Sequence, residues 1–270
     1  MDETEVGRQA AALLALLGTG RQLADRPPLD MADAYAVSAR IRTLREARGE
    51  TPLGRKIGFT NTTIWERYGV DGPMWNWVYD TTLGRADNGE ANRSLAGMPE
   101  PRIEPEIVFG LGAAPARGMD EAALLGCIAW VAHGFELVQS VWPGWRMTAP
   151  EAAAAFGLHG ALVVGPRRPV AGDRKAWAAA LASFSVTLLR DGAPRDRGEA
   201  ANVLGGPLSA LRFLVDEIAR RPGSPPLAAG EIVTTGTLTD AWPAAPGETW
   251  TAAFSGIDLP AVTLRLTDGA

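Results

Sequence analysis

Four segments in the last third of the chain alternate apolar and polar residues and end at turn-forming residues. Because a period of two is typical of half-buried strands, they predict a β-rich region. The segments read SFSVTLLRDG, GEIVTTGTLT, ETWTAAFSG and AVTLRL. One helix interrupts them, PLSALRFLVDEIARR, with Pro207 at its start and Pro222 after it. Four such strands in the last third of the chain predict a hydrophobic core that is built around a β-sheet.

The rest of the chain shows no regular alternation of strands and helices. It also lacks the glycine-rich strings GxGxxG and GxxxxGK followed by Ser or Thr. These features disfavour a Rossmann fold or an α/β barrel. We therefore expect a mixed α/β (α+β) fold with a largely antiparallel or mixed sheet. With 270 residues, 46% of them hydrophobic, the chain can bury the core of one large domain.

Two helices are expected before the β-rich part. Repeating leucines predict the first helix over residues 4–17, and Asp30 is placed to cap a second helix that ends at Gly49. Neither helix carries residues with evident chemistry. We therefore divide the chain into an N-terminal helical segment, 1–50, and a β-rich domain, 51–270, that folds as one structural unit.

Charge and cysteine content limit the partners and the compartment. The net charge is −5 and there is no run of Lys and Arg, so we expect no nucleic-acid partner. The N-terminus is acidic with only a short apolar stretch, which resembles neither a signal peptide nor a membrane span. The single cysteine, Cys127, lies in an apolar run. A buried thiol and a reducing cytoplasm fit this pattern.

Two glutamates flank a proline in the segment PRIEPEIVFGL. On a strand, Glu104 and Glu106 share one face about 7 Å apart, so their repulsion must be offset by a cation, by protons or by water. With two histidines and no cysteine pair, any metal here would be one that prefers oxygen ligands.

A third glutamate follows a predicted helix. Residues 119–134 read as a helix capped by Asp120 and ended by Gly134, and the next strand, FELVQSVW, carries Glu136. A strand, helix, strand crossover can return the second strand beside the first. We therefore expect that the three glutamates can meet.

Other polar and aromatic residues have competing interpretations. Lys56 lies on a short strand, RKIGFT, where a lysine is usually solvated. Residues 61–69 predict one or two helical turns. The residues Trp75, Trp77 and Tyr79 alternate, which indicates either one buried face of a strand or an aromatic lid over a pocket, and core packing is the commoner outcome.

Several motifs, in this order and spacing, resemble the 2-keto-4-pentenoate hydratase family of the fumarylacetoacetate hydrolase superfamily, in its hydratase and decarboxylase branch. They are GRKIGFT, EPEIVFGL, FELVQS, ANVLGGPLSALRFLVDEI and LAAGEIVTTGTLTDAWPAAPGETWTAAFSGI, and the match spans about residues 30–266. The resemblance implies a mixed β-roll or β-sandwich with flanking helices, as in the C-terminal domain of fumarylacetoacetate hydrolase. It also implies a divalent Mg or Mn, a small-molecule 2-oxo acid substrate from aromatic compound catabolism, and homo-oligomers.

The resemblance implies a role for most of these residues. Metal ligands are expected at Glu104, Glu106 and Glu136, and Lys56 matches an active-site lysine whose proton a nearby cation can loosen toward acid/base catalysis. The family's substrate-binding Gly-Ser/Thr turn matches Gly236 and Thr237, which are assigned to the substrate carboxylate.

The chain also departs from the family pattern. The family's Pro-Asp-Phe is replaced by Pro73, Met74 and Trp75, so the acidic residue is missing or moved to Asp71 or Asp80. An expected Asp-Asn pair is replaced by Gly157 and Leu158, followed by His159, which is either a new acid/base group or a histidine at the edge of the core. The tryptophans indicate an altered pocket, and Trp77 is assigned to its distal wall.

The leading functional hypothesis is a hydro-lyase that acts on an unsaturated 2-oxo acid, of the 2-hydroxypenta-2,4-dienoate type, through a metal-chelated dienolate. A 2-oxo dioic acid decarboxylase of the 4-oxalocrotonate decarboxylase type uses the same chemistry and stays open. A carbon–carbon bond hydrolase of the superfamily is disfavoured, because its His/Glu pair has no clear counterpart here. A non-catalytic metal-binding scaffold subunit is the alternative from a different class.

Overall fold

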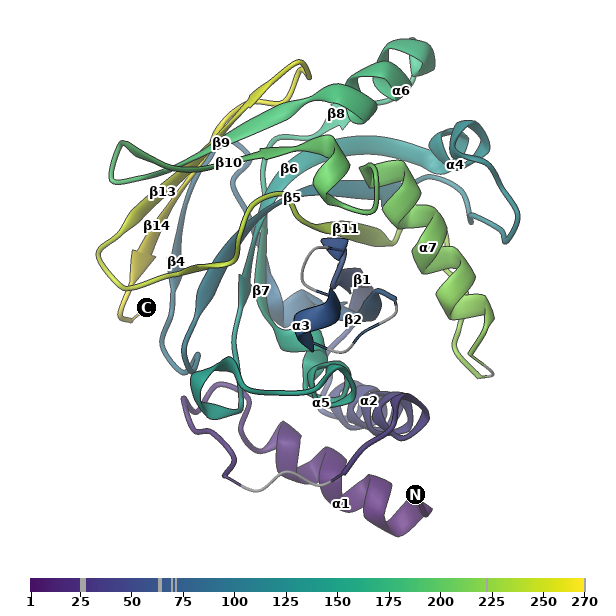
Figure 1. The fold of residues 1–270 in the computed structure, drawn as a ribbon, viewed down its shortest axis with the longest axis vertical. Coiled ribbons are helices and arrows are strands. Elements are labelled where there is room, and N and C mark those ends of the chain that lie inside the picture. Colours follow the sequence, from purple (N-terminus) through teal and green to yellow (C-terminus); the bar gives the residue numbers. More distant parts are fainter. Residues whose placement is uncertain (25–27, 63–64, 69, 71, 222, 270) are drawn as a thin grey trace.

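A computed structural model describes residues 1–24, 28–62, 65–68, 70, 72–221 and 223–269. It shows two β-sheets flanked by helices (Figure 1). The helices are α1 (Glu3–Leu14), α2 (Met31–Ala47), α3 (Trp65–Tyr68), α4 (Glu121–Cys127), α5 (Ala149–Ala154), α6 (Arg174–Ser183) and α7 (Pro207–Ala219). The mixed α+β class is therefore confirmed.

The larger sheet has nine strands. Its main path runs in the order β2-β1-β11-β5-β6-β7-β3, with β12 added to β5 and β8 added to β6. These strands are β1 (Pro52–Gly58), β2 (Met74–Tyr79), β3 (Leu83–Arg85), β5 (Arg102–Leu111), β6 (Ile128–Val138), β7 (His159–Val164), β8 (Arg168–Pro169), β11 (Ile232–Thr237) and β12 (Trp242–Pro243). The pairs β1/β11 and β3/β7 are parallel and the other pairs are antiparallel, as expected for a mixed sheet.

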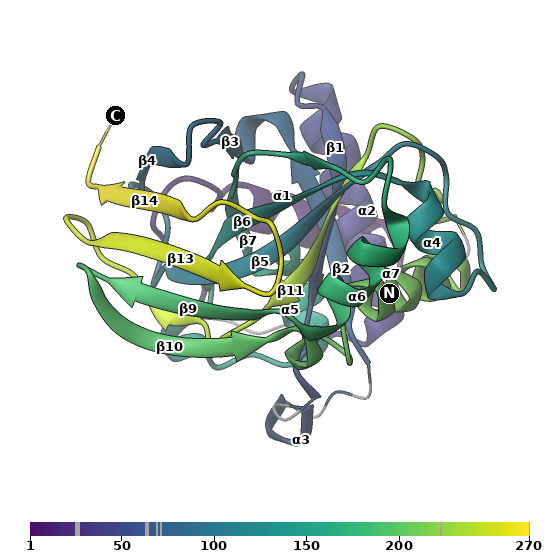
Figure 2. The same cartoon turned by 90° about the horizontal axis from the view of Figure 1, so that it is seen from above.

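The smaller sheet has five strands in the order β10-β9-β13-β14-β4. They are β4 (Glu90–Ser94), β9 (Ser185–Arg190), β10 (Ala193–Glu199), β13 (Thr249–Ser255) and β14 (Val262–Thr267). Figure 2 shows this sheet on one side of the larger sheet, with helices α4 and α7 toward the opposite side. The four alternating segments of the last third are β9, β11, β13 and β14, so that prediction is confirmed.

The N-terminal helices share the main hydrophobic core with the sheets. Leu13 of α1 and Val37 of α2 belong to the same buried cluster as Trp250 of β13. Asp30 caps α2 as expected, because its side chain accepts a hydrogen bond from the Asp33 N–H. The division at residue 50 stays a prediction. Cys127 is a buried free thiol, as predicted.

The predicted helix over 119–134 is wrong in its second half. Asp120 does cap α4, but the helix ends at Cys127 and β6 begins at Ile128. Periodicity cannot separate a buried strand from a helix in a short apolar run such as this. A β-carbon at Gly134 would lie 2.8 Å from the Val108 side chain. This glycine therefore allows close strand packing and does not end a helix.

The expected crossover is corrected as well. Strands β5 and β6 are antiparallel neighbours, joined by the loop 112–120 and by α4, which runs directly into β6. The alternating aromatic residues at 75, 77 and 79 lie in β2, where every residue is buried, and not in a lid. The predicted turns at 61–69 are described only as α3, because residues 63, 64 and 69 lie outside the described part. No described helix is long and apolar enough to span a membrane.

Candidate active site

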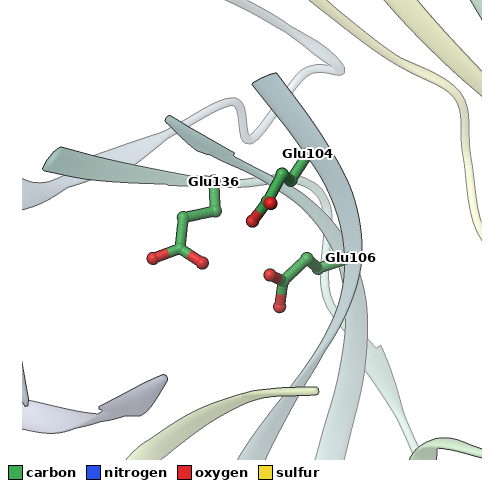
Figure 3. A group of neighbouring side chains, drawn as sticks. All are labelled: Glu104, Glu106 and Glu136. Carbon is green, nitrogen blue, oxygen red and sulfur yellow. The ribbon is translucent and has the colours of Figure 1, made fainter. Parts of the chain in front are cut away.

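The register of β5 and β6 brings the three glutamates together. Glu104 faces Glu136 directly across the antiparallel pair, and Glu106 faces Gly134. Directly opposite residues share a face of the sheet, and so do residues two apart on one strand. All three carboxylates therefore project to one side (Figure 3), and one oxygen of each lies within 4.8 Å of the others. The prediction that the glutamates meet is confirmed.

The carboxylate cluster is buried and short of positive charge. Glu106 and Glu136 are fully buried, whereas Glu104 is partly exposed. Burial raises the pKa of all three carboxyl groups, and repulsion from Glu136 adds to the effect at Glu104 and Glu106, while the charge of Lys56 opposes it; the pKa of Glu104 is raised to about 8 in total. Within the described residues, Glu106 Oε1 and Glu136 Oε2 have no hydrogen-bond partner. Two buried oxygens without hydrogen-bond partners, of which only the Glu136 oxygen has an ammonium nearby, and an all-oxygen donor set fit a hard divalent cation.

Lys56 is the ammonium beside this cluster. The side chain comes from β1 and is 2% exposed, so the solvated alternative is wrong. Its Nζ lies 3.3 Å from Glu136 Oε2 and donates a hydrogen bond to the Gly157 carbonyl at 3.0 Å. Burial lowers the pKa of Lys56, but the charges of the three glutamates outweigh it, and the pKa is raised. Without a cation, the lysine is therefore held protonated.

Gly157 makes the approach of Lys56 possible. Its φ is +61°, and a β-carbon there would lie 2.8 Å from Asn76 Cβ and 3.3 Å from Lys56 Cδ. The neighbours Phe156 and Leu158 also have positive φ, at 59° and 66°. Three consecutive left-handed residues are costly, since only glycine adopts this region freely. This strained backbone conformation places the Gly157 carbonyl within hydrogen-bond distance of Lys56.

His159 touches the glutamate cluster from β7. Its Nδ1 lies 2.7 Å from Glu136 Oε1, and its Nε2 lies 2.9 Å from the Thr82 hydroxyl. Burial first, and then the charges of Lys56, Arg45 and Arg93, lower the pKa of His159 well below its usual value. The neutral ring donates its Nδ1 proton to Glu136, which fixes that carboxylate.

The contact between His159 and Glu136 was not anticipated, because the sequence analysis found no His/Glu pair. Glu136 belongs at the same time to the carboxylate cluster and to the ion pair with Lys56. The pair is therefore part of the candidate metal centre and not a separate hydrolytic dyad.

Gly236 and Thr237 lie at an irregularity of β11. Gly236 has a φ of +95°, and a β-carbon there would lie 1.9 Å from Thr60 Oγ1. Its N–H donates to Glu106 Oε2 at 2.8 Å. The N–H therefore orients a candidate metal ligand, which leaves it unavailable to a substrate carboxylate. The Thr237 hydroxyl donates to the Thr239 carbonyl and faces the cavity described next.

A cavity of about 100 Å³ opens beside Lys56 and Glu104. Its walls are mostly apolar, with a small number of polar groups, which is typical of small-molecule sites. The lining residues are Lys56, Ile57, Gly58, Phe59, Thr60, Asn61, Met74, Arg102, Glu104, Val138, Trp145, Met147, Leu158, Thr237 and Ala241. The guanidinium of Arg102 lies 4.3 Å from the centre of the Trp145 ring.

The structure does not bring Asp80 or Trp77 to this cavity. Asp80 is exposed, and its carboxylate accepts hydrogen bonds from the backbone N–H groups of Thr51 and Thr81. Trp77 pairs with Arg55 across β1 and β2, whereas Asn76 pairs with Lys56, so Trp77 faces away from the glutamates. Both assignments are therefore corrected. Asp71 lies outside the described residues.

Three contributors were missed by the sequence analysis: Asn76, Thr82 and Arg102. Asn76 holds the Ala153 carbonyl at 2.8 Å beside Gly157. A pattern pointed to two of the three residues. Arg102 precedes Glu104 by two residues on a strand, and Asn76 lies between the two tryptophans that face the other way. No local signal identified Thr82, because its contact with His159 depends on the pairing of distant strands.

Comparison with known proteins gives consistent results. Residues 86–264 match the model of the fumarylacetoacetate (FAA) hydrolase C-terminal family. A 2-hydroxyhexa-2,4-dienoate hydratase of Comamonas testosteroni is 28% identical over 95% of this chain and 96% of its own length. A 2-keto-4-pentenoate hydratase of Burkholderia vietnamiensis is 30% identical over 88% of each chain.

Decarboxylases are similar to a comparable degree. A 4-oxalocrotonate decarboxylase of a Pseudomonas strain, CF600, is 28% identical over 86% of this chain and 85% of its own length. The solved structure of the 4-oxalocrotonate decarboxylase of Pseudomonas putida G7, complexed with magnesium and adipate, superposes with a TM-score of 0.88, at 24% identity and over 98% of both chains. This likeness shows that the fold is shared.

Proposed function

Because the chain belongs to the fumarylacetoacetate hydrolase family, we propose that it is a divalent-metal-dependent hydro-lyase that adds water to an unsaturated 2-oxo acid, of the 2-hydroxypenta-2,4-dienoate type. The observation that carries this proposal is the joining of three carboxylates and one buried lysine at one end of a mostly apolar cavity. Relatives named as hydratases, similar over nearly the whole chain, support the reaction class.

Glu104, Glu106 and Glu136 would hold the ion, with Mg or Mn as the expected metal. When bound, such an ion polarises the carboxylate and carbonyl oxygens of a 2-oxo acid and stabilises negative charge that develops on them. The Gly236 N–H and the His159 ring each hold one oxygen of a ligand carboxylate, on Glu106 and Glu136 respectively. These contacts fix the ligand geometry before the ion arrives.

Lys56 is the proposed proton carrier. It lines the cavity, and its ammonium is held between Glu136 and the Gly157 carbonyl. A cation among the glutamates would cancel the charges that raise the pKa of Lys56, so the lysine would release its proton more readily. In this role Lys56 donates a proton to a substrate carbon and takes one from water.

The walls of the cavity suit the hydrocarbon part of the substrate. Val138, Met147 and Leu158 are apolar and line it. They exclude bulk water from the reacting carbons, which strengthens the electrostatic effect of the charged groups at the polar end. Thr237 lines the same cavity and supplies a hydroxyl that a substrate oxygen can contact.

Decarboxylation of a 2-oxo dioic acid is the second candidate, and Arg102 favours it. Its guanidinium stacks on Trp145 at the cavity wall and makes no ion pair with any residue in the described part of the chain. A guanidinium whose hydrogen-bond donors are not engaged by an ion pair is suited to a second carboxylate at the far end of a substrate. The relatives named 4-oxalocrotonate decarboxylase support this candidate.

Turnover by the purified chain tests both candidates. The chain is incubated with Mg and either an unsaturated 2-oxo monoacid or the corresponding dioic acid, and loss of the conjugated absorbance is followed together with release of CO₂. Hydration without CO₂ supports the hydratase, and CO₂ release from the dioic acid supports the decarboxylase.

Failure with both substrates, in protein that binds the metal, contradicts the proposal and supports the scaffold subunit. Products of carbon–carbon cleavage would identify the hydrolase. The homo-oligomer and the cytoplasmic location stay predictions. The elution volume of the same preparation in size-exclusion chromatography tests the first.

A further inference from the structure

A second cavity, of about 390 Å³, lies behind His159 and shares no lining residue with the cavity beside Glu104. It is bordered by the end of α2, the turn after β2, strand β4 and the loop before β5. The residues that matter for its chemistry are Arg45, Arg48, Glu50, Thr82, Arg93 and Gln139. We call it the arginine pocket.

The arginine pocket carries more positive than negative charge. Three arginines line it against one carboxylate, Glu50. Arg45 contacts Glu50 at 2.5 Å, and Arg48 lies 3.8 Å from the same carboxylate. Arg93 is partly buried and has no hydrogen bond or ion pair with any described residue, and burial lowers its pKa. A half-buried guanidinium with no protein partner keeps its paired donors available to an anion.

Another cavity has the same number of lining arginines, but each of them has an ion-pair partner, so the arginine pocket differs from it in the unpaired Arg93. A cavity between α2, β2 and the end of α7 is lined by Arg42, Arg220 and Arg221. There Arg42 pairs with Glu46, and the other two pair with Glu217.

We propose that the arginine pocket binds a small oxyanion, through a carboxylate or phosphate group that engages Arg93 and Arg48. Arg45, 2% exposed and fixed by Glu50 and by the face of Tyr79, adds a rigid positive charge. Guanidinium groups recognise both anions by paired hydrogen bonds. The proposal concerns a site other than the glutamate cluster and does not depend on the proposed reaction.

The pocket is connected to the glutamate cluster by hydrogen bonds. Thr82 lines the pocket and contacts His159 Nε2 at 2.9 Å, and His159 Nδ1 contacts Glu136 Oε1 at 2.7 Å. Thr82 therefore links the wall of the pocket to the ring that orients a candidate metal ligand. An anion that shifted Thr82 would change how His159 holds Glu136.

Calorimetric titration at constant ionic strength tests the site. Inorganic phosphate and succinate are the two probes, and the parent chain is compared with Arg93→Gln and with Arg40→Gln. Arg40 is exposed on α2 and does not line the pocket, so its variant removes the same charge elsewhere. We expect saturable binding by the parent, at least about tenfold weaker binding by Arg93→Gln, and a change below about twofold for Arg40→Gln.

The stronger probe distinguishes a phosphate ligand from a carboxylate ligand. Equal affinity in all three proteins, or binding that never saturates, overturns the proposal. If Arg93→Gln does not fold, Arg93→Lys keeps the charge but loses the paired donors, and unchanged affinity in that variant equally overturns it.

The two histidines of the chain give an independent readout. His159 adjoins the pocket through Thr82, whereas His133 contacts the Glu106 carbonyl, Phe135 and Phe254. In NMR spectra of the imidazole groups, the bound probe is expected to shift the His159 signals, to leave those of His133 in place, and to have no such effect in Arg93→Gln. Equal shifts of both histidines, or none, contradict the proposal.

Discussion

Arg55 and Lys56 are neighbours in β1, both basic and both nearly inaccessible, yet they serve opposite sides of one strand. Arg55 is 1% exposed and Lys56 is 2% exposed. Arg55 faces α2 and the aromatic side chains of β2, whereas Lys56 faces the three glutamates. The Arg55 face and the Lys56 face of β1 differ in how their buried charges are paired. This difference distinguishes a structural ion-pair cluster from a candidate active site.

On the Arg55 face the charges are paired, although Arg55 Nε has no hydrogen-bond partner within the described residues. Arg55 pairs with Glu231 and donates to the Pro225 carbonyl at 3.2 Å, and its guanidinium lies 3.2 Å from the centre of the Trp77 ring. Arg42 covers the same ring at 3.9 Å and pairs with Glu46. Burial lowers the pKa of Arg55 to about 10, so it stays charged at neutral pH.

On the Lys56 face one ammonium meets three carboxylates, and two buried carboxylate oxygens lack hydrogen-bond partners in the described structure. This arrangement is incomplete as a structural feature, because burial without compensation costs stability. The same excess of buried negative charge is expected at a site that binds a cation. Imbalance of buried charge, more than burial itself, therefore marks the functional face.

The largest expected effect comes from Lys56→Met. Loss of the ammonium removes the proposed proton carrier, so turnover should fall by about 10²- to 10⁴-fold while metal binding survives. Steady-state kinetics and a metal titration on the same preparation measure this. The matched variant Arg55→Met should retain turnover per folded molecule but lose stability, because Glu231 loses its partner. A Lys56→Met variant with turnover within about threefold of the parent would remove lysine from the mechanism.

Trp77→Ala should lower the free energy of unfolding by about 3–5 kcal/mol, the usual cost of emptying a buried tryptophan site. If Trp77 lined the substrate pocket, as expected from its position in the sequence, the same change would alter substrate preference instead. Urea denaturation measures the loss. Trp145→Ala is the comparison, since Trp145 lines the cavity beside Glu104. Trp145→Ala should change KM and lower stability less than Trp77→Ala does. A change in KM with Trp77→Ala, together with a large loss of stability with Trp145→Ala, would contradict these two assignments.

Glu106→Gln should weaken binding of Mg or Mn by more than about tenfold, because it removes charge but keeps shape. Titration calorimetry measures the affinity. Glu231→Gln is the control on the other face, and we expect its metal affinity to equal that of the parent. Equal affinities in both variants and the parent would refute the metal centre.

The smallest effect concerns pH. The pKa of Glu104 is raised to about 8 in the metal-free fold, so that fold binds more protons than the unfolded chain between the unfolded value near 4.5 and about 8. The contribution of Glu104 to the stability of the metal-free protein is therefore fully present below about pH 4.5 and is lost as pH rises through this window. Between pH 6.5 and 7.5 the loss that Glu104 contributes is about 1.2 kcal/mol, because the fold holds most of one extra proton over this single pH unit.

Thermal unfolding of metal-free protein at these two pH values measures the change as a shift of about 2–4 °C. Glu104→Gln should weaken this dependence without abolishing it, because the pKa values of Glu106 and Glu136 are raised as well, and the metal-loaded parent should lose it. A metal-free parent whose midpoint does not change would show that Glu104 is already ionised in the fold.

The glutamate cluster could be predicted from the sequence because it follows from the geometry of β-strands. Side chains two apart share a strand face, and Glu136 lay one strand away from Glu104. The connection between the strands was wrong, since the apolar run from Ile128 fits a helix or a strand equally well. The meeting of the carboxylates did not depend on that choice.

The two faces of β2 could not be assigned from the sequence alone. Alternation separated Trp75 and Trp77 from Asn76, but only the pairing with β1 shows that Asn76 lies on the side of Lys56. Asp80 was proposed because it stood near a missing acidic residue in the chain. Closeness along the chain says little about direction, and the turn after β2 points that carboxylate to solvent.

The facing positions of Glu104 and Glu136 on adjacent strands have a consequence for local opening. An ion bound by both carboxylates would add a cross-link between β5 and β6, in addition to their backbone hydrogen bonds. Amide hydrogen exchange in these two strands would then require local openings that also release the ion, so added metal should slow it. The exchange rates of amides in the five-stranded sheet should not depend on metal.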